Sequence, residues 1–161
     1  MRASDAATER LHDLLNEAVR DALSLEAVLE RETRALSLRD LEKLDDAVVT
    51  KHQIAQSLER ITREQTALLQ AEGFEPDRQG IEACLRVWDQ EGLMRPLWGR
   101  LQDTMERCRR HNQINGGVVQ THQRQVQQAL QILRGEDART ELYDPRGRTV
   151  ASGPSRHISE A

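Results

Sequence analysis

The chain has 161 residues and a formal net charge of −4, with 31% charged, 37% hydrophobic and only 2% aromatic residues. This length suits one domain, and the scarcity of aromatic side chains argues against a thick globular core or a β-sandwich. The acidic balance gives no reason to expect a nucleic acid or an anionic membrane as a partner.

Apolar residues recur at alternating steps of three and four, the spacing that places them on one side of a helix. The short link at Leu36–Ser37 implies an antiparallel hairpin, because no other path would bury both apolar stripes. We predict an all-α fold, an elongated antiparallel bundle with three long helices, one short connecting helix and a disordered C-terminal tail. The helical domain covers 8–134, with helices at about 8–36, 38–72, 78–89 and 94–134.

Three details of the first hairpin stand out in the sequence. Ser37 is predicted to cap the second helix, and Asp40, three residues later, completes a capping box. Glu32 occupies a seam position near the end of the first helix. We interpret this end as frayed, because acids are rarely buried without a partner. Lys51 and His52 interrupt the seam of the second helix.

The last long helix has an apolar stripe that turns polar in its middle, at Asn112 and Asn115. Gly116 and Gly117 follow, and each costs a helix interior about 1 kcal/mol relative to alanine. We call residues 112–117 the polar waist. It either fixes the register of the helix against its neighbours or acts as a hinge that lets the distal half of the helix detach.

Beyond the polar waist the helix carries a modest apolar stripe opposite a glutamine-rich side. Such a helix is either a third member of the bundle or a platform for an amphipathic segment of another protein. We call the following residues the distal stripe: Val118, Val119, His122, Val126, Leu130 and Leu133.

The periodicity ends at Gly135, and we expect a flexible tail over 135–161. Within it, Tyr143 precedes Asp144, Pro145 and Gly147, which occupy the places that a type I turn favours. Such a turn would present the only tyrosine of the chain as an aromatic anchor for docking, at a low ordering cost.

The sequence contains no phosphate-binding loop, zinc signature or nucleophile elbow, so we expect neither enzymatic activity nor a cofactor or metal. Cys84 and Cys108 have no paired spacing, which suits free thiols in a reducing compartment. A thiol- or metal-dependent enzyme that uses both cysteines and His111 is the alternative from another class. No signal peptide and no apolar span of about 18 residues is apparent, so we expect a cytoplasmic protein without membrane insertion.

A basic run near the middle of the last helix has two interpretations, a nucleic-acid patch or a solvated face. The second is favoured, because Asp103 and Glu106 lie at helical spacing and no aromatic residues are interleaved. The run consists of Arg107, Arg109, Arg110 and His111.

Three motifs occur in a fixed order along the chain. They are Leu36-Ser37-Leu38-Arg39-Asp40-Leu41-Glu42-Lys43-Leu44 followed by Lys51, then Asn112-Gln113-Ile114-Asn115-Gly116, then Leu130-Gln131-Ile132-Leu133-Arg134-Gly135 leading to Tyr143-Asp144-Pro145-Arg146-Gly147. The resemblance that they carry extends over most of residues 8–148. In this ordered combination the chain resembles the FlgN family of flagellar export chaperones.

The resemblance implies a cytoplasmic chaperone of the flagellar type III export system. Such a protein binds the C-terminal segments of hook-associated proteins of the FlgK and FlgL type, prevents their premature assembly and delivers them to the export gate. The client contact maps onto the distal stripe. Docking on the cytoplasmic domain of the export-gate membrane protein maps onto Tyr143 and its turn (Asp144, Pro145 and Gly147). The chain free of client is compatible with a homodimer, and a structural coiled-coil homodimeric adaptor without an export role is the competing hypothesis.

Overall fold

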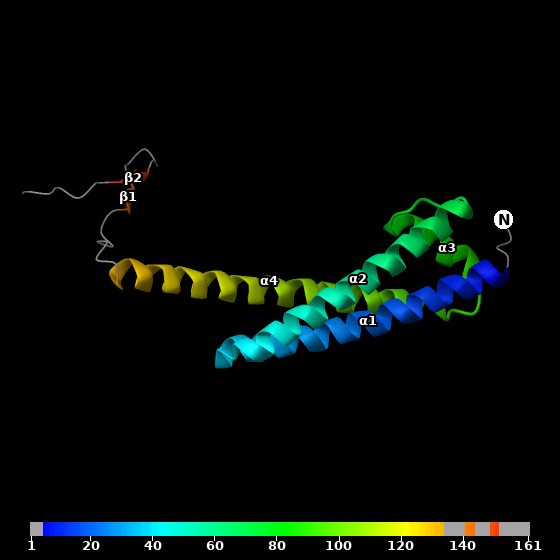
Figure 1. Cartoon of the computed structure of the whole chain (residues 1–161). Coiled ribbons are helices and arrows are strands. Elements are labelled where there is room, and N and C mark those ends of the chain that lie inside the picture. Colours follow the sequence, from blue (N-terminus) through cyan, green and yellow to red (C-terminus); the bar gives the residue numbers. More distant parts are fainter. Residues whose placement is uncertain (1–4, 134–140, 144–148, 152–161) are drawn as a thin grey trace, which may run out of the picture. The chain divides into compact units, whose positions relative to one another are not determined.

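The computed structural model of the chain describes residues 5–133, 141–143 and 149–151. They form helices α1 (Asp5–Leu38), α2 (Leu41–Ala71), α3 (Arg78–Trp88) and α4 (Met94–Leu133), and strands β1 (Glu141–Tyr143) and β2 (Thr149–Ala151) (Figure 1). The predicted all-α fold class is confirmed, and the helices begin and end within a few residues of the predicted positions. Among the described residues, every helix falls short of the combined length and apolarity that crossing a bilayer requires.

The chain divides into two compact units, Met1–Gly117 and Val118–Ala161. In the first unit, α1 and α2 form the predicted antiparallel hairpin, drawn from blue to green in Figure 1. The core of this unit is built from apolar side chains of all four helices, and α1 supplies more of them than any other helix. The core includes Leu11, Leu14, Leu15, Ala22, Ile61, Leu69, Ile81, Leu85, Trp88 and Leu101.

The second unit contains the remainder of α4 and the two short strands. β1 and β2 pair antiparallel, with Leu142 opposite Val150. The sequence predicts no regular structure after Gly135, so these six residues are a small addition to the helical fold.

The turn between α1 and α2 differs from the predicted capping box. α1 continues through Leu38, and the Ser37 hydroxyl donates to the backbone carbonyl of Thr33 (3.0 Å) instead of capping α2. Arg39 takes a left-handed conformation (φ 52°), and Asp40 is the true cap, accepting a bond from the Lys43 amide at 3.1 Å. The chain can therefore reverse in two residues, and the sequence prediction placed the cap three residues too early.

A buried carboxylate organises the start of α4. Asp89 is 6% exposed, and its two oxygens accept the backbone N–H groups of Leu93, Met94 and Arg95 at 2.8, 3.0 and 2.8 Å. Burial by itself would raise the pKa of Asp89, but these donors, led by Met94, outweigh it and lower the pKa. Asp89 thus satisfies the amides of the first two residues of α4, the helix that carries the candidate site, and of Leu93 directly before it.

Candidate functional site

The polar waist of α4 packs against α1 in the first unit. Asn115 is only 1% exposed, and its amide nitrogen donates to the carbonyl oxygen of Leu29 (3.1 Å) and to Glu32 Oε1 (3.0 Å). The Thr33 hydroxyl lies 2.9 Å from Asn115 Oδ1 and 2.6 Å from His111 Nε2. A one-turn shift of α4 would break these bonds, so they favour one register of α4 on α1.

Glu32 belongs to the same cluster, and the interpretation of this position as frayed is wrong. Its side chain is buried, and Oε2 lies 2.7 Å from Lys51 Nζ of α2. Lys51 also donates to Asn112 Oδ1 at 3.2 Å. The lysine that interrupts the seam of α2 is therefore the counter-charge of the acid that interrupts the seam of α1.

This waist cluster (Glu32, Thr33, Lys51, His111, Asn112 and Asn115) joins three helices through polar groups. Buried amide and ionic groups stabilise one alignment over others, because a shifted alignment leaves them unpaired. The geometry favours the register interpretation for Asn115. Asn112 is exposed, and its side chain accepts a hydrogen bond from Lys51.

Packing, by contrast, does not require glycine at positions 116 and 117. A Cβ atom at either position would meet nothing within 4 Å, and both glycines are helical without a positive φ. What distinguishes them is their low helix propensity, directly after the waist cluster. The hinge hypothesis therefore depends on these two residues.

The distal stripe exposes apolar surface along the rest of α4. Val126, Leu130 and Leu133 are 59%, 44% and 82% exposed, whereas Val118, Val119 and His122 are half-buried. Ile132, which is not part of the distal stripe, is 67% exposed. A helix with such uncovered side chains has room for an apolar partner.

The predicted docking turn is described only at its first residue. Tyr143 ends β1 opposite Thr149 of β2. Asp144, Pro145 and Gly147 lie outside the described residues.

The two cysteines are poorly suited to thiol chemistry. Both are buried, and burial, together with the nearby charge of Glu72, raises the pKa of the Cys84 thiol to about 12. Burial also raises the pKa of Cys108, whose Sγ lies 3.6 Å from the carbonyl oxygen of Ala22. The reactive form is the thiolate, so neither position favours a nucleophile or a metal ligand. Within the described ranges, no three His, Cys, Asp or Glu side chains lie close enough to hold a metal ion.

The basic run of α4 is balanced by carboxylates. Arg107 pairs with Glu26 of α1 at 2.6 Å, and this bond lowers the pKa of the Glu26 carboxyl. Arg109 and Arg110 lie 2.7 and 3.8 Å from Glu106 of their own helix. This arrangement supports the interpretation as a charge-balanced helix face.

The described helices bond α4 to the hairpin through the waist cluster, and the rest of α4 carries exposed apolar side chains. Exposed apolar surface on a helix is typical of helical modules that bind other proteins. Comparison with protein families is more specific, since the family described as "FlgN protein" matches residues 1–151. The chain belongs to the FlgN family, a family of flagellar export chaperones. Comparison with curated proteins and with solved structures gives no match.

Proposed function

We propose that the protein is a cytoplasmic chaperone for hook-associated proteins of the FlgK and FlgL type, and that it delivers them to the type III export gate. The proposal extends the general role of the FlgN family to particular clients and to a particular surface. The observation that carries it is the exposure of the distal stripe, above all Leu133, at 82%. Such apolar surface on a charged, helical chain favours association with a partner.

The mechanism requires no chemistry. A disordered amphipathic segment of the client folds as it covers the distal stripe, gaining about 25 cal/mol per Å² of apolar surface removed from water. Part of this gain is offset by the entropy lost when the segment orders, so the affinity stays moderate and release at the gate remains feasible. Tyr143 and its turn supply the contact to the cytoplasmic domain of the gate.

A paired substitution tests the client surface. Val126→Gln with Leu130→Gln removes two exposed apolar side chains without touching the core of the first unit. Each apolar side chain that a partner buries contributes about 1.5–3 kcal/mol, so we expect at least a roughly tenfold weaker complex with a purified hook-associated protein, measured by calorimetry. Gln128→Ala with Gln131→Ala, on the opposite side of the helix, is the control and should bind as the natural chain does. Equal affinity of all three proteins would refute the client surface.

Truncation separates the client from the gate. A chain ended after Arg134 should still bind the hook-associated protein but no longer bind the gate domain. A chain ended after Gly117 should bind neither. Tyr143→Ala in the full chain should reproduce the first result. If the chain ended after Arg134 no longer bound the client, the client contact would have to lie in the tail.

Stoichiometry distinguishes the competing adaptor. A chaperone forms a one-to-one complex with a client, while a structural coiled-coil adaptor remains a homodimer when the hook-associated protein is added. Light scattering on the purified mixture gives the mass of the complex directly.

A further inference from the structure

The turn that joins α1 and α2 exposes a cluster of apolar side chains. Seven large apolar side chains are exposed among the described residues of the first unit, and four of them lie within residues 38–49. We call these four the turn patch: Leu38, Leu41, Val48 and Val49. Leu38 and Leu41 are 72% and 73% exposed. The turn patch lies at the cyan end of the hairpin in Figure 1.

Helix geometry gathers the patch on one side of α2. Leu41, Val48 and Val49 are seven and eight residues apart, a spacing that places them on the same side of a helix. Ala47, on the opposite side, is buried. Leu38 ends α1 three residues before Leu41. The exposed side chains therefore form a cluster, which is typical of an interaction surface, and are not scattered single residues.

Three carboxylates accompany this patch, and all three are exposed. They are Glu42, Asp45 and Asp46. None of them forms an ion pair within the part of the chain that the structure describes. The neighbouring Lys43 is already paired with Asp40 at 3.7 Å, and Arg39 in the turn is the remaining cation of this stretch. Acidic side chains thus dominate the charge around the turn patch.

The acids lie along one flank of the patch. Asp45 is four residues from both Leu41 and Val49, so it sits between them on the same side of α2. Glu42 and Asp46 are also four residues apart and form the next row around the helix. A partner that covers the apolar row would therefore meet a row of uncompensated negative charge beside it.

This combination of groups selects the chemistry of the partner. Nucleic acids and anionic membranes carry negative charge, which the three acids repel. A helix with apolar residues on one side and lysine or arginine along one flank complements both parts of the surface.

We propose that the turn patch docks a basic amphipathic helix of another protein. The apolar side of that helix packs on Leu41 and Val48, and its cations face the carboxylates of Glu42, Asp45 and Asp46. The turn patch belongs to the first unit and shares no residue with the distal stripe. The docked protein is therefore a partner in addition to the client, and the inference goes beyond the proposed function.

The test titrates the full chain with a designed helical peptide of roughly 14 residues, which has leucines on one side and lysines along one flank. We expect the backbone amide signals of residues 38–49 to shift by NMR. We also expect the affinity to fall at least roughly tenfold between about 0.05 and 0.5 M salt, because exposed charges are screened. A twin peptide with glutamate in place of lysine should bind at least roughly tenfold more weakly. Equal binding of the two peptides, or unmoved signals at 38–49, would overturn the proposal.

Two variants remove the two parts of the surface. Leu41→Gln with Val48→Gln should weaken the lysine peptide at least roughly tenfold, because two apolar contacts are lost. Val87→Gln with Leu93→Gln, at exposed positions outside the patch, is its control and should bind normally.

The charge variant combines Glu42→Gln, Asp45→Asn and Asp46→Asn. It should bind the lysine peptide roughly threefold more weakly or worse and lose most of the salt dependence. Its control neutralises three exposed acids elsewhere, Glu9→Gln, Asp13→Asn and Glu91→Gln, and should keep both the affinity and the salt dependence. An unchanged salt dependence in the charge variant would contradict the assignment of the acids.

Other occupants of the patch give different results. If a purified hook-associated protein shifts the amides of 38–49, or loses affinity for the Leu41→Gln, Val48→Gln chain, the patch belongs to the client surface. If the same amides shift with protein concentration alone, the patch joins two copies of the chain. Either result would overturn this inference and leave the proposed function standing. If the lysine peptide docks as expected and no hook-associated protein binds the natural chain, the proposed function fails alone.

Discussion

Lys51 Nζ of α2 lies 2.7 Å from Glu32 Oε2 of α1, and the Glu32 side chain is only 5% exposed. Each residue places a charge in the apolar seam of its own helix, and the charge of one is compensated by the charge of the other. Because Asn115 of α4 donates to the second oxygen of Glu32, this ion pair also reaches the third long helix. The waist cluster therefore links both helices of the hairpin to α4 through polar contacts.

Removing the lysine should destabilise the protein strongly. Lys51→Met leaves a buried carboxylate without its counter-charge, and we expect a loss of about 3 kcal/mol in the free energy of unfolding in urea. Adding Glu32→Gln should recover most of this loss, because the amide oxygen still accepts from Asn115. The exposed pair Lys43–Asp40, at 3.7 Å, provides the control, and Lys43→Met should cost less than about 0.5 kcal/mol. Equal effects at both lysines would contradict the assignment.

The two asparagines of the polar waist should behave differently. Asn115→Leu deprives the Leu29 carbonyl and Glu32 of a buried donor, so we expect a loss of about 1–3 kcal/mol in unfolding free energy. If Asn115 fixes the register, this variant should also show doubled amide signals for α4 by NMR. Asn112→Leu, at an exposed position, should change stability by no more than about 0.5 kcal/mol and retain single signals. A uniform spectrum for Asn115→Leu would leave the residue a stabilising role without a register role.

Asp89 should give the protein an acid-sensitive component of stability. Its folded pKa lies below the unfolded value near 3.8, because three backbone N–H groups stabilise the carboxylate. The contribution is therefore fully present above about pH 4 and is lost as the pH falls through the folded pKa. Asp89→Asn should cost about 0.5–2 kcal/mol at pH 7, and the difference from the natural chain should shrink below pH 4. Urea unfolding from pH 2 to 7 measures this, with Asp45→Asn at an exposed position as the control. A difference that stays constant with pH would exclude the carboxylate charge as its cause.

The helices could be predicted because the spacing of apolar residues within each segment indicates them. The waist cluster could not, because its residues come from three different helices. The spacing of Leu11, Leu15 and Leu29 is enough to place α1 and its buried side. Glu32 was misjudged because its partner, Lys51, lies on another helix, and a single sequence does not show which residues meet across a hairpin. Both residues are nevertheless visible in the sequence, because each places a charge in an apolar seam, where a charge needs a partner.

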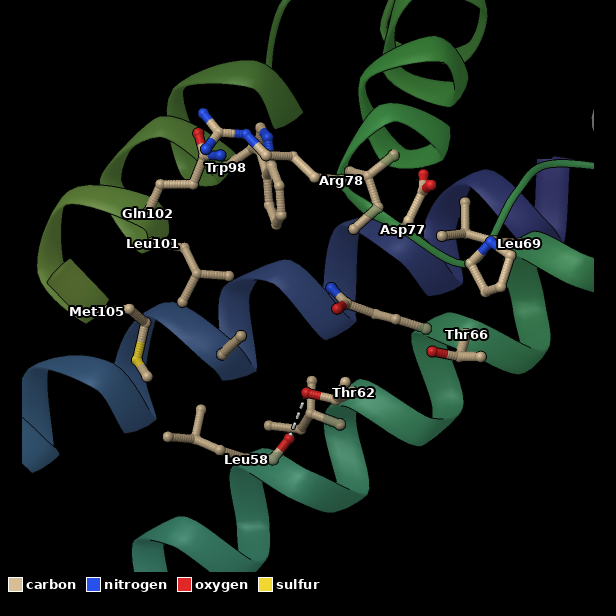
Figure 2. A pocket seen from close by; sticks show the side chains of 15 residues that line it. Leu58, Thr62, Thr66, Leu69, Asp77, Arg78, Trp98, Leu101, Gln102 and Met105 are labelled. Atoms are coloured by element: carbon tan, nitrogen blue, oxygen red, sulfur yellow. Dashed lines mark hydrogen bonds between the residues drawn. The ribbon is translucent and has the colours of Figure 1, made fainter. Parts of the chain in front are cut away.

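Two further features depend on geometry that periodicity does not encode. Asp89 binds backbone amides that lie four to six residues after it in the chain, at the start of α4. The chain can bring these amides back to Asp89 because Gly92 takes a left-handed conformation (φ 71°). The cavity lined by Gln65 and Trp98 takes its walls from all four helices (Figure 2). Sequence analysis can list the polar residues on each helix, but it cannot tell which of them lack a partner after packing.

The glycines after the waist cluster provide the test of the hinge. Gly116→Ala with Gly117→Ala places methyl groups where they meet nothing, so we expect the helix to gain about 1 kcal/mol of propensity per substitution. If opening at these glycines lets the distal stripe accept a client, amide hydrogen exchange over 112–133 should slow and the complex with a hook-associated protein should weaken. Gly99→Ala is a matched control, because it lies in the same helix and its Cβ also meets nothing within 4 Å. It should stabilise α4 comparably and leave both exchange at 112–133 and client binding unchanged. If the double variant binds its client as tightly as the natural chain does, the polar waist serves register alone.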